Sequence, residues 1–392
     1  MGFEIMWFRT SLVCLLAIVL GCTSGLSNHE SGTVSSSELL EGAPLGGVQD
    51  LPDLVKNEEV LAVSPEMRAF LDENVHQKAT IGVRMNELID AIIDEKTFGL
   101  VFVEKTRTAS ELFEYRSGNC LSFSNMFVAM ARYVNLEATF QEVQIPPDWS
   151  FQNDVFLLNR HVNVHVDLGP LDDHVVDFNI DDFKSSYDLR KISDARARAH
   201  YFNNMGVESM QAGDIAAALG YFRKAIADND RQFSPAWTNL GTLYSRTGHP
   251  EYAEAAYLLA LKVDNGDLVA MSNLAGFYQH RGDAERAATY RKRVIDHRRE
   301  NPYYRYQRAR DAYAAGDYST AISNLKYAVR VKKNEDEFYF LLGMCYLKKG
   351  DERAAKRWLA KAEEVAATDA LKRRYSSKLE LLLSEMNSSD SR

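Results

Sequence analysis

The chain has 392 residues, enough for two or three domains, and its 46% hydrophobic and 26% charged residues are typical of folded globular protein. The formal net charge is -9, and the 46 Lys and Arg residues form no basic stripe. Because phosphate binding needs a concentrated basic surface, composition and charge argue against a nucleic-acid partner.

The N-terminus has the features of a secretion signal. Residues 12–20 form an apolar run that is shorter than the roughly 20 residues a membrane-spanning helix needs. The run leads into "VLGC" at 19–22, which resembles the bacterial lipobox, where the signal is cleaved before a cysteine that then carries lipid. This pattern predicts a signal peptide over 1–21 and a lipidated Cys22. A conventional cleaved signal and an uncleaved anchor are the alternatives.

A stretch rich in Ser, Gly and Glu follows over 22–58 and shows little periodicity. This composition predicts a flexible tether. With lipid on Cys22, the tether would hold the folded part of the protein at a bacterial cell envelope, and the expected place is the outer membrane, facing the periplasm. The lipid anchor is the only membrane contact that we expect.

Residues 59–190 change from a helical to a strand pattern. Apolar residues at helical spacing in "EMRAFLDENV" and "GVRMNELIDAIID" predict helices. From about residue 137 the period becomes two, and in "HVNVHVDL" the valines share one strand face while His161, Asn163 and His165 share the other. "HVVDFNI" follows as a hairpin partner would. Helices followed by antiparallel strands predict an α+β domain over 59–190.

Cys120 is the cysteine for which the sequence predicts chemistry. Of the four cysteines, Cys14 lies in the predicted signal peptide, Cys22 is the predicted lipidation site, and Cys345 has the setting of a small core residue. The segment "RSGNCLSFSNMFVAMAR" at 116–132 puts Cys120 at the start of an amphipathic helix. Unpaired backbone N–H groups and the helix dipole favour a thiolate at that place.

A nucleophilic cysteine needs a base, and the base needs an orienting acceptor. His161 is the candidate base, with His165 on the same strand face as the alternative, and Asp177 on the next strand is the candidate acceptor. No His, Cys and Asp residues have zinc or calcium spacing, and no Gly-rich phosphate loop is present. We therefore expect neither a metal nor a cofactor.

Three segments together carry a family resemblance: "TASELFEYRSGNCLSFSNMFVAMARYVNLEATF", "RHVNVHV" and "HVVDFNID". Their order resembles the transglutaminase-like superfamily of papain-like cysteine enzymes, over about residues 60–185. The resemblance implies that Cys120 is the nucleophile, His161 the base and Asp177 the orienting carboxylate. It also implies action on peptide or amide bonds. Asn163 stands where an aromatic residue is common in that family.

The second half of the chain repeats with a period of 34 residues. Gly213, Gly248, Gly282, Gly316 and Gly350 recur at intervals of 35, 34, 34 and 34, with small residues at matched positions before and after each. Small residues let two helices approach closely, and glycine permits the tight turn between them. The pattern resembles tetratricopeptide repeats. It predicts an all-α solenoid of five repeats over 199–365, closed by a capping helix over 366–386.

Three asparagines occupy one position in consecutive repeats: Asn204, Asn239 and Asn273. An amide side chain offers both a donor and an acceptor, which suits capture of an extended peptide backbone. The pattern predicts a groove for a protein or peptide partner. The alternative is that the asparagines lie on an ordinary solvated helix face.

These features together predict an envelope-anchored cysteine enzyme that acts on peptide or amide bonds of a protein held by the repeats. One alternative is a non-catalytic scaffold or assembly lipoprotein in which the transglutaminase-like domain is degenerate. Another is a deamidase or a cross-linking acyltransferase, which needs the same three residues but a different acyl acceptor.

Overall fold

The computed structural model describes residues 34–47, 53–93, 98–144, 149–152, 155–158, 161–169, 173–177, 188–366, 372–373 and 375–377. The predicted signal peptide, the lipidation site Cys22 and most of the predicted capping helix lie outside these residues. Among the helices that are described, none combines the length and the apolar character needed to cross a membrane.

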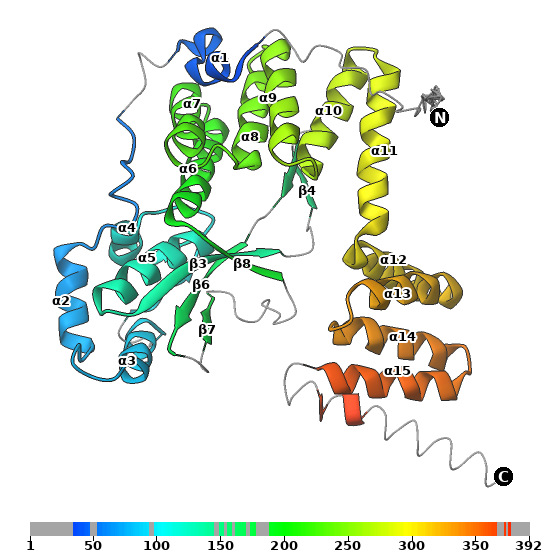
Figure 1. The fold of residues 1–392 in the computed structure, drawn as a ribbon. Coiled ribbons are helices and arrows are strands. Elements are labelled where there is room, and N and C mark those ends of the chain that lie inside the picture. The colour runs from blue at the N-terminus through cyan, green and yellow to red at the C-terminus, as the bar shows by residue number, and fades with distance from the viewer. Residues whose placement is uncertain are drawn as a thin grey trace, which may run out of the picture.

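Helices come first in the α+β part of the chain, as the residue pattern predicts (Figure 1). They are α2 (Pro65–Asn74), α3 (Ile81–Ile93), α4 (Ala109–Tyr115) and α5 (Cys120–Tyr133). Between them, two short strands pair in parallel, β1 (Val101–Phe102) and β2 (Ser117–Gly118).

A four-stranded sheet follows, with the strand order β7-β6-β3-β8 and antiparallel pairing throughout. Its strands are β3 (Glu137–Gln144), β6 (His161–Asp167), β7 (Asp173–Val176) and β8 (Asp188–Ile192). A separate hairpin is formed by β4 (Trp149–Gln152) and β5 (Val155–Leu158). The predicted hairpin is present as β6 and β7, with Val164 opposite Val176.

Helix α5 is the centre of this part of the core. Every residue from 121 to 131 is buried, and the helix packs against β3 and β6. The valines of β6 at 162, 164 and 166 are at most 3% exposed and supply the apolar face of the strand. Burial of these side chains fixes the distance between the helix and the sheet.

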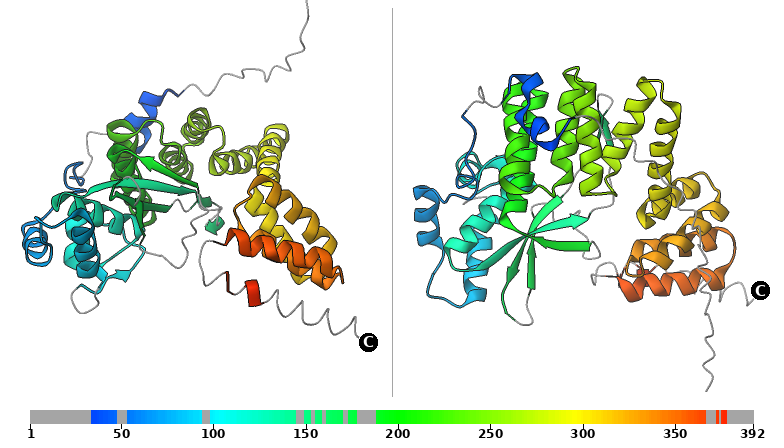
Figure 2. Two further views of the ribbon diagram at one scale, coloured as in Figure 1. Left: turned by 60° about the horizontal axis from the view of Figure 1, so that its bottom comes forward. Right: turned by 45° about the horizontal axis from the view of Figure 1, so that its top comes forward.

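Five antiparallel helix pairs form the second half of the chain (Figures 1 and 2). Each of the five periodic glycines lies between the helices of a pair with φ between 75° and 82°, which confirms the predicted turns. The pairs are α6 (Asp194–Gln211) with α7 (Ile215–Arg223), which the π-helix η2 (Lys224–Asn229) extends, α8 (Ser234–Arg246) with α9 (Pro250–Val263), α10 (Leu268–His280) with α11 (Ala284–Glu300), α12 (Pro302–Ala314) with α13 (Tyr318–Val331), and α14 (Asp336–Lys348) with α15 (Glu352–Val365).

Residues 34–47 correct the prediction of a flexible tether over 22–58. They form α1 (Ser36–Glu41) and the turn η1 (Ala43–Leu45), which contact α9 and α7 (Figure 2). A capping box between Ser35 and Glu38 starts the helix. Leu39 is 1% exposed, and its carbonyl oxygen accepts a hydrogen bond from the hydroxyl of Tyr244 at 2.6 Å. Two leucines in a polar stretch are enough to dock this segment on the repeats.

Most of the buried apolar residues of the described chain fall into two clusters. One extends from Leu39 to Val294 and joins the α+β part to the first three helix pairs. The other extends from Ala309 to Tyr375 and holds the last two pairs together. The division lies between α11 and α12. The α+β part is therefore packed as one body with the start of the solenoid.

Candidate functional site

Cys120 is the first residue of α5, as predicted, and its side chain is partly exposed. Asn119 caps the helix: its Oδ1 accepts the backbone N–H of Ser122 at 2.9 Å. Gly118 gives the tight entry, because a Cβ there would lie 2.8 Å from Cδ1 of Leu112. The local sequence thus places the thiol among the free N–H groups of a helix start.

His161 opens β6, and Asp177 directly follows β7. Nε2 of His161 lies 2.6 Å from Oδ2 of Asp177. The two side chains are 15% and 1% exposed, so the ion pair is largely shielded from water. The strand order brings together two residues that are 16 positions apart in the sequence.

The thiol of Cys120 completes this arrangement. Burial lowers the pKa of His161, but hydrogen bonds from its ring to Asp177 and to the Cys120 side chain raise it by more, to about 9. The carboxylate of Asp177 contacts Nε2 of His161, so Nδ1 is the ring nitrogen that is left to contact the thiol of Cys120. At neutral pH the imidazole is therefore protonated and lies between a carboxylate and a sulfur.

His165, the alternative base, lies elsewhere. It is four residues further along β6, roughly 13 Å from His161 at the rise of a β-strand. It is 4% exposed and stands opposite Thr139 of β3. The structure brings His161, and not His165, to the Cys120 end of the strand.

Asn163 is a site residue that the sequence pattern did not single out. It is fully buried, and its Nδ2 donates to Oδ2 of Asp177 at 3.1 Å. That oxygen also contacts His161, so two neighbouring side chains of one strand face hold the same carboxylate. The pairing of Val164 with Val176 puts Asn163 opposite Asp177. Only the strand register reveals this role.

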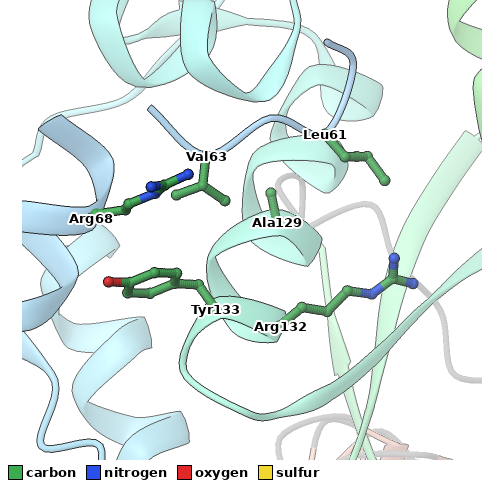
Figure 3. A pocket seen from close by; sticks show the side chains of 6 residues that line it. All are labelled: Leu61, Val63, Arg68, Ala129, Arg132 and Tyr133. Carbon is green, nitrogen blue, oxygen red and sulfur yellow. The ribbon is translucent and has the colours of Figure 1, made fainter. Parts of the chain in front are cut away.

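A surface hollow of about 410 Å³ lies at the other end of α5 (Figure 3). Ala129 lines it and is nine residues, or roughly 14 Å, from Cys120 along the helix. Arg132 also lines it, but its guanidinium points away, toward Asp194 at 2.6 Å (Figure 3). The hollow is therefore separate from the thiol. Within the described part of the chain, no group of three or more His, Cys, Asp or Glu side chains could hold a metal ion.

The three asparagines of the repeats lie on α6, α8 and α10, the first helices of their pairs. Nδ2 of Asn239 donates to Oδ1 of Asn203 at 2.8 Å, and Nδ2 of Asn273 donates to Oγ1 of Thr242 at 3.5 Å. Asn204 is half-buried. Two of the three amides thus bridge neighbouring repeats through their N–H groups. Peptide binding by these residues stays a prediction.

Comparison with known proteins identifies the repeats. Two family models of the tetratricopeptide repeat match residues 234–267 and 312–373. Over 125 residues the chain is 25% identical to anaphase-promoting complex subunit 3 of Schizosaccharomyces pombe, a match that covers 32% of this chain and 19% of that protein. The chain thus spans about a fifth of this curated relative.

Two solved structures are also similar to parts of the chain. A crystal structure of MamA is 19% identical, with 43% of this chain and 91% of that chain covered and a TM-score of 0.24. PilF of Pseudomonas aeruginosa is 15% identical, with 51% and 90% covered and a TM-score of 0.27. These scores are too low to carry an argument about function.

One family match lies within the helix pairs and the other begins in them and extends to residue 373, and neither overlaps residues 59–190. The comparisons therefore support the scaffold alternative better than the enzyme interpretation, which rests on the sequence resemblance and on the contacts of Cys120, His161 and Asp177. The helix pairs of the second half form a solenoid of tetratricopeptide repeats.

Proposed function

We propose that this chain is a protein-binding scaffold in which the tetratricopeptide solenoid holds a protein partner. The tetratricopeptide matches over 234–267 and 312–373 carry this proposal. The curated relative is, by its name, a subunit of a protein complex, which agrees with an assembly role. An extended segment of the partner would lie along the first helices of the repeats, where Asn204, Asn239 and Asn273 offer amide groups to its backbone.

The scaffold function is tested by comparing the wild-type chain with a variant that carries Asn204→Ala, Asn239→Ala and Asn273→Ala. We expect cross-linking in cells to recover a defined partner with the wild type and to lose it with the triple variant. Gln279→Ala, at an exposed position on α10, is the matched control. If the triple variant and Gln279→Ala recover the partner equally well, the three asparagines do not bind the partner.

A second function is favoured by one specific observation, the contact of His161 with both Asp177 and Cys120. We infer a cysteine enzyme of the transglutaminase-like type that acts on an amide bond of the bound protein. Sγ of Cys120 adds to the carbonyl carbon, and the C–N bond breaks while His161 gives its proton to the leaving nitrogen. Water then adds to the thioester, the C–S bond breaks, and the thiol and a carboxylic acid are released.

The remaining parts of this proposal rest on sequence motifs. The "VLGC" stretch supports lipidation at Cys22 and a place in the bacterial cell envelope. If an amine replaces water in the second half of the reaction, the same residues perform cross-linking. Deamidation is hydrolysis of a glutamine side-chain amide by the same steps.

The enzyme function is tested by alkylation with iodoacetamide at neutral pH, read out for each cysteine by peptide mass spectrometry. We expect fast alkylation of Cys120 that slows in His161→Ala and persists in His165→Ala. Cys345 is the internal reference, because it is buried and burial raises its pKa to about 11. If His161→Ala leaves the Cys120 rate unchanged, the enzyme proposal fails and the scaffold function stands alone.

A further inference from the structure

We propose that the first tetratricopeptide helix, α6, is part of the Cys120 site, and that Glu208 on α6 is a positioning residue for the thiol. The proposal rests on the cysteine-enzyme function proposed above. It means that the repeats build the thiol site as well as bind a partner.

The link from Glu208 to Cys120 consists of hydrogen bonds. Oε1 of Glu208 accepts the backbone N–H of Thr106 at 2.8 Å, and Oε2 contacts Nζ of Lys105 at 2.7 Å. Thr106 is 2% exposed, and its Oγ1 accepts from Nδ2 of Asn119 at 2.8 Å. Asn119 is the cap of the helix that begins with Cys120. A carboxylate is a strong acceptor for a backbone N–H, so it holds this loop firmly.

Helix α6 is also tied to the strand pair that carries His161. Oε1 of Glu142 on β3 accepts Nε of Arg196 at 2.7 Å and contacts Nε2 of His200 at 2.7 Å, and both partners lie on α6. Glu142 stands opposite Val162, the residue next to His161. Burial raises the pKa of the Glu142 carboxyl, but His200 and Arg196 together lower it by more and hold it well below its usual range, so the carboxyl is ionised at neutral pH.

One helix of the solenoid therefore bonds to a neighbour of each element that meets at the thiol–imidazole contact: to the loop that holds the cap of α5, through Glu208, and to β3 beside the His161 strand, through Arg196 and His200. A third tie joins Arg132, at the far end of α5, to Asp194 at 2.6 and 2.9 Å. These ties fix α5 and the sheet relative to each other, and a site of this kind tolerates little displacement.

The proposed peptide-binding face leads to the same place. Asn204 lies four residues before Glu208, one helical turn away on the same face of α6. A protein segment held at Asn204 would therefore lie beside the residues that hold the cap of the Cys120 helix. This placement assigns the substrate class: an extended segment of the protein that the repeats bind.

The test is the pH profile of Cys120 alkylation by iodoacetamide in the full chain, with each cysteine resolved by mass spectrometry. For Glu208→Ala we expect the rate at neutral pH to fall by about threefold to tenfold and the profile to move to higher pH, because the cap loses its support. Glu208→Gln keeps an acceptor for Thr106 and is expected to recover most of the rate. Lys105→Met is the matched control, since it removes only the half-exposed partner of Glu208.

A second variant keeps the proposal testable if Glu208→Ala does not fold. Thr106→Val is close in shape and removes only the hydroxyl that accepts from Asn119, and we expect the same shift in its profile. A folded Glu208→Ala or Thr106→Val chain with the wild-type rate and profile would overturn the positioning role. Failure of the enzyme proposal gives a different result, because His161→Ala would then match the wild type.

Discussion

The hydroxyl of Ser124 on α5 lies 3.0 Å from the backbone oxygen of Val162 on β6, and its single hydrogen is shared with the backbone oxygen of Cys120 in the same helix, also at 3.0 Å. Ser124 lies one turn after Cys120, and Val162 is next to His161. The bond is buried and joins the helix that carries the thiol to the strand that carries the imidazole. A hydrogen bond at this point fixes the position of α5 along the axis of β6. Apolar packing alone does not fix that position, because it has no directional contacts.

Ser124→Ala is therefore expected to slow alkylation of Cys120 and to lower the free energy of unfolding by about 1–2 kcal/mol, because the Val162 oxygen loses a donor. Chemical denaturation and cysteine-resolved alkylation measure the two effects. Ser272→Ala is the matched control, since among the described residues that hydroxyl bonds to the backbone oxygen of Leu268 within its own helix and to no other element. A Ser124→Ala chain that behaves like Ser272→Ala would show that the bond does not position the thiol.

The ionisation of His161 gives a prediction with a definite sign. The pKa of a histidine in an unfolded chain is about 6.5, and contacts with Asp177 and Cys120 raise that of His161 to about 9 in the folded chain. The folded state holds the proton more tightly. Protonation of His161 therefore stabilises the folded state; this contribution is fully present below about pH 6.5 and is lost as the pH rises through about 9.

Histidine-selective NMR can follow this titration among the nine histidines. We expect one resonance with a midpoint near pH 9 that is absent from His161→Gln and moves to lower pH in Asp177→Asn. Burial is the largest single influence on the ring and lowers its pKa, and the carboxylate of Asp177 is one of the two partners that outweigh it, so its removal should lower the pKa of His161. An unchanged midpoint in Asp177→Asn would contradict this assignment.

The residues of the candidate site differ in how far sequence could reveal them. Cys120, His161 and Asp177 stand at a helix start, a strand start and a strand end, positions that local patterns mark. Asn163 was visible only as an unusual residue for the resembled family, because its contact with Asp177 depends on the register of β6 against β7. Glu208 carries no local signal, since its bond to Thr106 spans 102 residues.

The fold shows the same division between local and long-range information. The helix pairs could be predicted because the turn glycines and the small packing residues are required by local steric effects. The docked segment over 34–47 was hidden in a polar stretch, although Ser35 and Glu38 form a capping box that sequence can reveal. What could not be derived was the surface that receives Leu39, because that surface is built by residues about 200 positions away, such as Tyr244.

Two glycines in first helices of the repeats predict opposite effects of the same substitution. In α6, a Cβ on Gly206 would lie 2.5 Å from the ring of Phe222, which is fully buried. Gly206→Ala should lower the free energy of unfolding by about 1–3 kcal/mol. In α10, a Cβ on Gly276 would meet no atom within 4 Å. Gly276→Ala should raise that free energy by up to about 1 kcal/mol, as helix propensity dictates. Chemical denaturation that gave both variants the same sign would contradict the packing of the pairs.

The two apolar clusters predict that the chain unfolds in two steps. At their boundary, α11 contributes only Ala287 and Val294 to the buried residues, and α12 contributes only Ala309. In a repeat array each helix pair is stabilised by its neighbours, so a weak junction separates two cooperative units. We expect calorimetry of the full chain to show two transitions.

Two leucines assign the transitions. Leu240 on α8 belongs to the first cluster and Leu342 on α14 to the second, and neither is exposed. Each substitution to alanine should cost its own unit about 2–5 kcal/mol and leave the other transition in place. The fast alkylation rate of Cys120 should fall to that of an unfolded cysteine when the first unit melts and should survive the melting of the second, since α5 and α6 both lie in the first. A single transition that moves equally in Leu240→Ala and Leu342→Ala would show that the junction transmits stability and that the solenoid unfolds as one body.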